Sequence, residues 1–375
     1  MSKTLLSSRQ VKQLIKAVGN KRTVLVEGEA GCGKTSIHYA LKADPQFANY
    51  YAPKPIDCTQ LSDGSIVMPD IDRSRGVARE LPNERLGVSD ENHLGTKDAT
   101  PVLMCFDEIA KSRQFIKDTI APIVYERRIG NYVMPNGSVV FACTNLSEEG
   151  LGDSLAAHLR NRLVIVGMRK PTKDEWVQDF AIPNDLNENV IAAAEMYPMV
   201  FNSFMDYRPG GQFASKQLRK DNPYISDPAD AGQEQVVTPR SLHAASDLVD
   251  QMAHVDNQTL QAALGGTVGE PFAANIMSMI RFGESLPAFD RILADPEGSP
   301  LPSNPTAQVV QCFQFLTQVK DKEAAEQTSI YVQRMREEMQ SLFVNCVVNS
   351  TKMDKFALSK TFGSALAKNR QYLGQ

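Results

Sequence analysis

The residues with the clearest chemical potential form one glycine-rich run, Gly28-Glu29-Ala30-Gly31-Cys32-Gly33-Lys34-Thr35-Ser36. Its spacing, GxxxxGK followed by Thr, is typical of a loop that binds phosphate between a strand and a helix. The glycines let the backbone wrap the phosphates with its N–H groups turned inward, and the following helix contributes the positive end of its dipole. We expect Lys34 to bind the β- and γ-phosphates of a nucleotide and the Thr35 hydroxyl to bind Mg²⁺.

Two adjacent carboxylates, Asp107 and Glu108, follow an apolar stretch at residues 102–106. A strand there would carry both acids to the carboxyl edge of a parallel sheet, where open α/β folds bind ligands. Asp107 can then help to hold hydrated Mg²⁺, and Glu108 can polarise a water molecule for attack on the γ-phosphate. Acids at such a position often only cap the next helix, but the phosphate loop upstream favours the chemical interpretation.

A third polar group, Asn145, ends the apolar run VVFACTN. At the same sheet edge its amide can orient the attacking water or sense the γ-phosphate without adding charge. The alternative is an Asn that merely starts a turn, because Asn is a common turn residue.

Two arginines, Arg160 and Arg162, stand just before the last predicted strand, in the run LRNRL. A planar guanidinium suits the charge that spreads over a phosphoryl group during transfer, and a neighbouring subunit can supply it. The alternative for either residue alone is a solvated surface ion pair of little energetic consequence.

A further arginine, Arg240, opens an apolar-periodic helix in the run TPRSL. Proline at the first turn fixes the start of that helix, so Arg240 would project from a rigid element, as suits a nucleotide sensor on a lid. The alternative is an ordinary arginine at a helix start.

Strand and helix patterns alternate in the first half of the chain, which predicts an α/β unit with a largely parallel sheet. The expected strands cover residues 23–27, 55–58, 102–106, 139–143 and 163–166. From about Arg169 the pattern becomes helical, with a long polar loop at 207–235 and a Pro-rich break at 295–305. We therefore expect a nucleotide-binding core (1–168), a helical lid (169–294) and a C-terminal helical extension (295–375).

The composition is that of an ordinary globular protein of two or three domains. The chain has 375 residues, of which 42% are hydrophobic, and 40 Lys and Arg against 44 Asp and Glu give a net charge of −4. This balance argues against a protein that coats nucleic acid. Neither a membrane-spanning run nor a signal peptide is recognisable, so a cytoplasmic location is expected. The six cysteines lack metal-ligand spacing and are interpreted as reduced, buried side chains.

Five runs of the sequence resemble, in the same order, the motifs of an AAA+ ATPase. They are GEAGCGKT, VLMCFDE, ACTN, HLRNRL and TPRSL. The stretch from DEIAKS to ACTN is most similar to the MoxR-like branch, with MPNGS as the turn of a hairpin. The lid followed by a Pro-rich break also resembles MoxR-like ATPases of tailed phages, whose location would be the host cytoplasm. Residues 61–100, where this branch carries an insert, are unusually polar, and the match becomes vague beyond Leu242.

The resemblance implies an αβα core with a five-stranded parallel sheet, a helical lid, and ATP with Mg²⁺ bound between the subunits of a ring, usually a hexamer. It assigns Gly28, Gly31, Gly33, Lys34 and Thr35 to the phosphate loop, with Ser36 beside it. Asp107 and Glu108 match the acidic strand end, Asn145 the first sensor, Arg160 or Arg162 the arginine finger, and Arg240 the second sensor.

The function expected from these motifs is an ATPase whose ring remodels or assembles a partner protein. MoxR-like proteins often work with a partner that has a von Willebrand A-type domain, which makes such a protein the leading expectation. Two alternatives stay open. One is a nucleic-acid motor, or the ATPase subunit of a nuclease or DNA-packaging system, and the other is an assembly scaffold that ATP switches.

Overall fold

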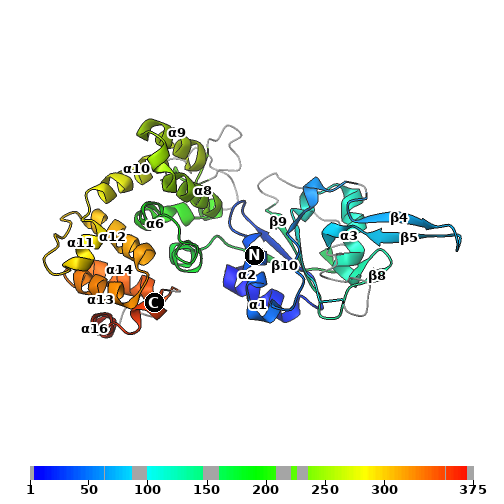
Figure 1. Cartoon of the computed structure of the whole chain (residues 1–375). Coiled ribbons are helices and arrows are strands. Elements are labelled where there is room, and N and C mark those ends of the chain that lie inside the picture. The colour runs from blue at the N-terminus through cyan, green and yellow to red at the C-terminus, as the bar shows by residue number, and fades with distance from the viewer. Residues whose placement is uncertain are drawn as a thin grey trace. The chain divides into compact units, whose positions relative to one another are not determined.

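The computed structural model describes residues 4–62, 64–86, 99–146, 160–207, 221–225, 235–350 and 352–369. The chain divides into two compact units, Met1–Lys170 and Pro171–Gln375 (Figure 1). The first unit contains a parallel sheet with helices on its faces, and the described part of the second unit is helical.

Six parallel strands form the central sheet of the first unit. In spatial order they are β1 (Leu5–Leu6), β10 (Val164–Met168), β2 (Val24–Gly28), β9 (Val139–Asn145), β6 (Leu103–Asp107) and β3 (Ile56–Asp57). The expected α/β fold is confirmed, but the expected number of five strands is wrong because β1 adds a sixth at the edge. A strand of two residues is too short to show a period of two in the sequence.

The central strands are buried on both faces, since their side chains alternate between two hydrophobic cores. In β9, Val139, Phe141 and Cys143 belong to one core, and Val140 and Ala142 belong to the other. This alternation explains the nearly continuous apolar runs in the sequence, which are typical of strands covered on both sides.

Helices α1 (Ser8–Val18) and α2 (Ser36–Lys42) contribute to one of these cores, and α3 (Gln114–Glu126) contributes to the other. A capping box starts α1, with the Ser7 amide donating to Gln10 at 2.8 Å and the Gln10 amide donating to Ser7 at 3.3 Å. The helices therefore form the outer layers of an αβα sandwich.

The first unit also contains two hairpins. The polar region 61–100 contains β4 (Val67–Asp72) paired with β5 (Val77–Pro82), a ribbon that extends from the first unit (Figure 1). The second hairpin pairs β7 (Arg128–Ile129) with β8 (Tyr132–Val133). The Glu80 amide donates to the Asn131 side chain at 2.7 Å, which joins the two hairpins.

The turn of the second hairpin differs from the expected one. MPNGS was expected to form it, but those residues follow β8 and lead into β9, whereas the hairpin turns at Gly130 and Asn131. Gly130 has φ of 55°, a left-handed conformation that two-residue hairpin turns require and that glycine adopts without strain.

The guanidinium of the half-buried Arg127 connects the end of α3 to the sheet. Arg127 donates to the Thr23 hydroxyl at 2.8 Å, to the Val124 carbonyl at 2.6 Å and to the Gly19 carbonyl at 2.9 Å. Burial lowers the pKa of Arg127 to about 10, so the group stays charged at neutral pH and its hydrogen bonds are charge-assisted.

Replacing Arg127 by Met is expected to lower the free energy of unfolding by about 2 kcal/mol, because the charge-assisted hydrogen bonds from its guanidinium to the Thr23 hydroxyl and to two backbone carbonyls are lost. The matched control is Arg128→Met, since Arg128 is exposed and its guanidinium contacts the exposed Glu126 carboxylate and the Gly130 carbonyl, the latter at 2.9 Å. That change is expected to cost no more than about 0.5 kcal/mol. Urea denaturation of both variants measures the difference, and equal losses would contradict the role given to Arg127.

The second unit is a stack of helices. Its described α-helices are α5 (Lys173–Trp176), α6 (Glu188–Met196), α8 (Pro239–Asp250), α9 (Asn257–Val268), α10 (Glu270–Glu284), α11 (Phe289–Ala294), α12 (Pro305–Gln318), α13 (Lys322–Val332), α14 (Glu337–Val348), α15 (Met353–Phe356) and α16 (Lys360–Lys368). A π-helical turn, Val177–Ala181, continues α5.

One hydrophobic core runs through the whole second unit. It includes Trp176 at the start, Ile280 in α10, and Phe313, Phe343 and Phe362 near the end of the chain. The expected lid (169–294) and extension (295–375) therefore share a core and lie in one compact unit. Most of the expected loop at 207–235 lies outside the described residues.

Two further observations concern the rest of the sequence analysis. All six cysteines are free and buried, as expected. Within the described part of the chain, no helix has both the length and the apolar character needed to cross a bilayer.

Candidate nucleotide-binding site

The glycine-rich run forms a loop at the carboxyl edge of the sheet, between β2 and α2. In the register of the sheet, Gly28 at the end of β2 lies between Asn145 on β9 and Met168 on β10. Gly31 and Gly33 have φ of 71° and 98°, which residues with a side chain rarely adopt. The glycine requirement inferred from the motif is thus a backbone requirement at these two positions.

The loop contains backbone N–H groups without an acceptor, as an anion-binding site requires. Within the described residues, the backbone N–H groups of Gly31, Gly33, Lys34 and Thr35 have no acceptor. Helix α2 starts directly after them. Free amides together with a helix N-terminus form a favourable position for phosphate.

The ammonium of Lys34 is buried at the centre of the site. Its side chain donates to the carbonyls of Gly28 at 2.9 Å and Glu29 at 2.8 Å, and to the Asn145 side-chain oxygen at 2.7 Å. The residue is only 5% exposed. The fold therefore brings Asn145 from β9 into direct contact with the lysine of the loop.

Thr35 and Asp107 meet at the position where a cation would bind. The Thr35 hydroxyl donates to the Asp107 carboxylate at 2.6 Å. Adjacent oxygen ligands of an octahedral Mg²⁺ lie ~3 Å apart, because each Mg–O bond is about 2.1 Å long. The two oxygens are thus close to the spacing that this ion needs, and they are of the type that it prefers. Both residues fit the Mg²⁺ role predicted for them.

Glu108 follows Asp107 in a left-handed backbone conformation, with φ of 53°. Such a conformation is costly for a residue with a side chain and is enriched at functional positions. The Glu108 carboxylate forms an ion pair with Lys111 at 3.1 Å, and both side chains are 24% exposed. Glu108 is therefore held at the sheet edge, next to the residue that fits a Mg²⁺ ligand.

Arg160 and Arg162 lie near the amino-terminal ends of the parallel strands, whereas the phosphate loop lies at their carboxyl-terminal ends. They precede β10, whose first residue, Val164, pairs with Val24 at the start of β2, while its last residue pairs with Gly28. At roughly 3.3 Å per residue the strand separates the two edges by more than 10 Å. Both arginines are exposed, so they are available to another molecule but remote from their own loop.

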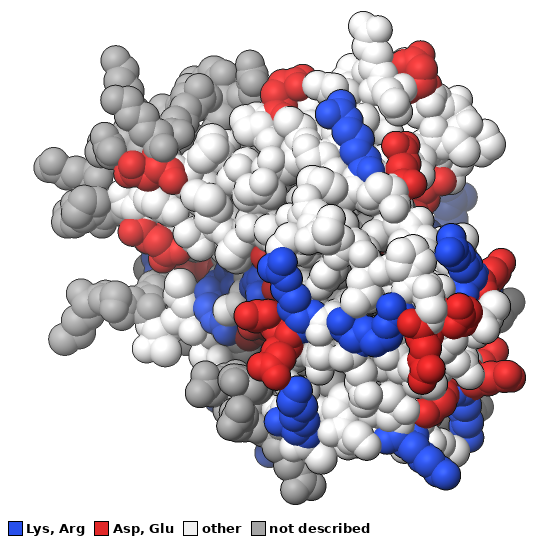
Figure 2. All heavy atoms as spheres, turned by 90° about the vertical axis from the view of Figure 1, so that its left-hand side faces the viewer, with Lys and Arg blue, Asp and Glu red and all other residues white. Residues whose placement is uncertain are grey.

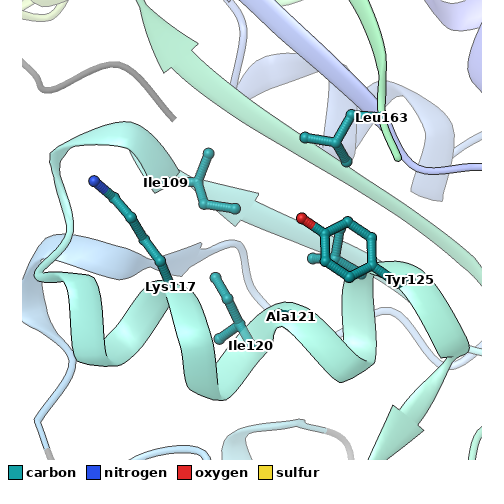
Figure 3. Close-up of a pocket in the computed structure, with 7 residues that line it drawn as sticks. Ile109, Lys117, Ile120, Ala121, Tyr125 and Leu163 are labelled. Atoms are coloured by element: carbon teal, nitrogen blue, oxygen red, sulfur yellow. The ribbon is translucent and has the colours of Figure 1, made fainter. Parts of the chain in front are cut away.

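A small pocket lies between α3 and the start of β10 (Figure 3). Ile109, Ile120 and Leu163 give it a mainly apolar lining, and Tyr125 lies at one end. The Arg162 guanidinium carbon lies 5.0 Å from the centre of the Tyr125 ring, within the range of a cation–π interaction. An apolar lining does not suit nucleotide phosphates, so this pocket is distinct from the phosphate loop.

The remaining predicted residues have clear positions. Ser36 donates to the Gly33 carbonyl at 2.6 Å and Ala30 is partly buried in the loop. Cys32 is buried there, and burial raises the pKa of its thiol to about 11. Arg240 is exposed at the second residue of α8 in the second unit, so its role as a sensor stays a prediction.

Two contacts in the site were not anticipated from the sequence. Lys111 pairs with Glu108, and Lys170 pairs with Glu29 of the phosphate loop. The i,i+3 spacing of Glu108 and Lys111 could have revealed the first contact. No local pattern links Glu29 to Lys170, which meet only because β10 lies beside β2.

Comparisons with known proteins give weak likenesses. No family model matches the sequence, and neither does any curated protein sequence. NtrX from Brucella abortus in complex with ATP is 15% identical with a TM-score of 0.36, over 100% of this chain and 70% of that one. A RuvB mutant from Thermotoga maritima is 16% identical with a TM-score of 0.34, over 81% of this chain and 80% of that one.

A full-length MCM homologue from Methanopyrus kandleri is 11% identical with a TM-score of 0.28, over 72% of this chain and 53% of that one. These values are too low to transfer an activity. What the chain does is therefore inferred from its own residues and their geometry.

Proposed function

We propose that this chain is a Mg²⁺-dependent ATPase. The observation that carries the proposal is the meeting of Lys34 with Asn145, and of Thr35 with Asp107, at a loop with unpaired amides. Such a site binds nucleotide phosphates and a magnesium ion. Bound Mg²⁺ would neutralise charge that develops on the phosphates. Glu108, next to Asp107, is the residue placed to polarise the attacking water.

We propose further that the active site is shared between subunits. Arg160 and Arg162 are exposed and lie at the edge remote from their own loop, which is where a residue that serves a neighbour is useful. An assembly in which each loop meets the next subunit's arginines is a head-to-tail one, which forms a ring when the rotation from one subunit to the next closes on itself. A hexamer is the expected size for the AAA+ class that the motifs resemble.

The biological role that we propose is the remodelling or assembly of a partner protein in the cytoplasm. It rests on the motif resemblance to the MoxR-like branch, including phage-encoded members, and an adaptor with a von Willebrand A-type domain is the leading candidate. Figure 2 shows Lys and Arg interspersed with Asp and Glu on the displayed face, so that face carries no single-sign field for nucleic acid. Stimulation of ATP turnover by single-stranded DNA, but not by protein, would favour a nucleic-acid motor instead.

Lys34→Ala tests the site itself. The change is expected to raise the ATP dissociation constant at least about 100-fold, because charge-assisted hydrogen bonds to phosphate are lost. The matched control is Lys21→Ala, an exposed lysine in the same unit, for which no change is expected. Calorimetric titration with MgATP measures both. Wild-type affinity in Lys34→Ala would remove the basis of the proposed function.

A further inference from the structure

The ammonium group of Lys34 already uses all of its hydrogen-bond donors within the protein. An ammonium has three N–H groups, and those of Lys34 donate to the Gly28 carbonyl at 2.9 Å, to the Glu29 carbonyl at 2.8 Å and to the Asn145 side-chain oxygen at 2.7 Å. The residue is 5% exposed, so water has little access to the group. A phosphate can therefore receive a hydrogen bond from Lys34 only if one of these three acceptors gives up its own.

The three acceptors differ in how easily they can leave. Gly28 and Glu29 accept through main-chain carbonyls, and Gly28 is the last residue of β2, paired with β9 on one side and with β10 on the other. Asn145 accepts through its side chain, which can turn away by rotation about its own bonds while β9 stays in the sheet. Asn145 is thus the acceptor that can release Lys34 without a movement of the main chain.

The orientation of the Asn145 amide follows from its partner. An ammonium only donates, so the oxygen of the amide must face Lys34 and its NH₂ group must point elsewhere. Within the described residues, this NH₂ group has no hydrogen-bond acceptor. An amide released from Lys34 is therefore a free donor at the edge of the phosphate loop, and a γ-phosphate could accept from it.

We propose that Asn145 is a specificity-determining residue, which competes with phosphate for Lys34 and thereby favours a nucleoside triphosphate over a nucleoside diphosphate. This inference rests on the proposed function. Both ligands must break the charge-assisted hydrogen bond between Lys34 and Asn145, but only a triphosphate has a γ-phosphate that gives the released amide a new acceptor. The cost is offset for the triphosphate and remains for the diphosphate, so the product of hydrolysis is held less tightly than the substrate.

The variant that tests the competition is Asn145→Leu, which is similar in shape and cannot accept a hydrogen bond. One buried donor of Lys34 then lacks an acceptor until a phosphate binds, so we expect the MgADP dissociation constant to fall roughly tenfold. The second ligand is MgAMP-PNP, a triphosphate whose β,γ-bridge resists hydrolysis. Its dissociation constant should change by less than about threefold, because the variant also loses the amide donor for the γ-phosphate. Calorimetric titration measures both.

A second variant at the same position should act in the opposite direction. Asn145→Asp keeps the shape of the side chain but adds a charge that holds Lys34 more firmly and repels phosphate, so MgADP binding should weaken at least about tenfold. The matched control is Asn20→Leu, which changes an exposed asparagine that precedes β2 in the same unit. It is expected to leave both dissociation constants unchanged.

The outcomes separate the inference from the function on which it rests. If Asn145→Leu binds MgADP no more tightly than wild type, Asn145 does not compete with phosphate and the inference is overturned. If MgADP and MgAMP-PNP both gain the same factor, the specificity assigned to Asn145 is wrong. A variant that is partly unfolded would bind both ligands less, which cannot produce the expected change in their ratio. Absence of binding of either nucleotide to wild type would instead overturn the proposed function, and this inference with it.

Discussion

Replacing both Arg160 and Arg162 by Ala is expected to lower the rate of ATP hydrolysis by about 10³–10⁵-fold, the range for loss of an arginine finger. Nucleotide affinity should change little, because both side chains lie at the sheet edge opposite their own loop. The physical reason is that a guanidinium stabilises charge that develops on the phosphoryl group only in the transition state. Phosphate release and MgADP titration separate the two effects.

A mixing experiment tests whether the arginines serve a neighbour. The double arginine variant and Lys34→Ala each lack a different part of the site, so mixed assemblies contain some intact loops beside intact arginines. Mixing under conditions that permit subunit exchange should therefore restore part of the activity. The control is Arg128→Ala, an exposed arginine of the same unit, which should hydrolyse ATP normally. Full activity of the double variant would refute the shared site, and exchange without rescue would place the arginines in their own subunit's site.

Replacing Glu108 by Gln is expected to slow hydrolysis by about 10²–10⁴-fold while ATP stays bound, because an amide cannot accept the proton of the attacking water. The substitution is nearly isosteric, so the unusual backbone at φ of 53° should be preserved. Single-turnover phosphate release gives the rate, and nucleotide retention after rapid filtration gives binding.

The matched control for this variant is Glu126→Gln, which changes an exposed carboxylate at the end of α3 that pairs with Arg128. It should hydrolyse ATP at the wild-type rate. Normal turnover in Glu108→Gln would show that another group activates the water. Loss of binding together with turnover would show that Glu108 holds the nucleotide rather than acting on water.

Local features of the site were predictable because each depends on residues close together in the chain. The strand, glycine loop and helix around Lys34 follow from one motif, and the apolar run before Asp107 places that acid at the end of a buried strand. The capping box that starts α1 was likewise visible in the spacing of Ser7 and Gln10. In each case the hydrogen bonds or the burial pattern that define the feature lie within one short segment.

Strand order decided the features that the sequence did not reveal. Asn145 contacts Lys34 because β9 pairs with β2, and Glu29 contacts Lys170 because β10 pairs with the other side of β2. Two further features differ from expectation for another reason: the edge strand β1 was not predicted, and the hairpin turns at Gly130 rather than at MPNGS. Both belong to two-residue strands, which are too short to show a periodic pattern in the sequence.

The sequence by itself therefore determined the chemical groups of the candidate site and the elements that carry them. Only the tertiary structure decided that Arg162 lies at the edge opposite Lys34, and that the buried carboxylate of Glu29 is neutralised from the end of the first unit. The physical reason is that side-chain type and local spacing are encoded within a segment, whereas the distance between two segments depends on which strands pair across the sheet.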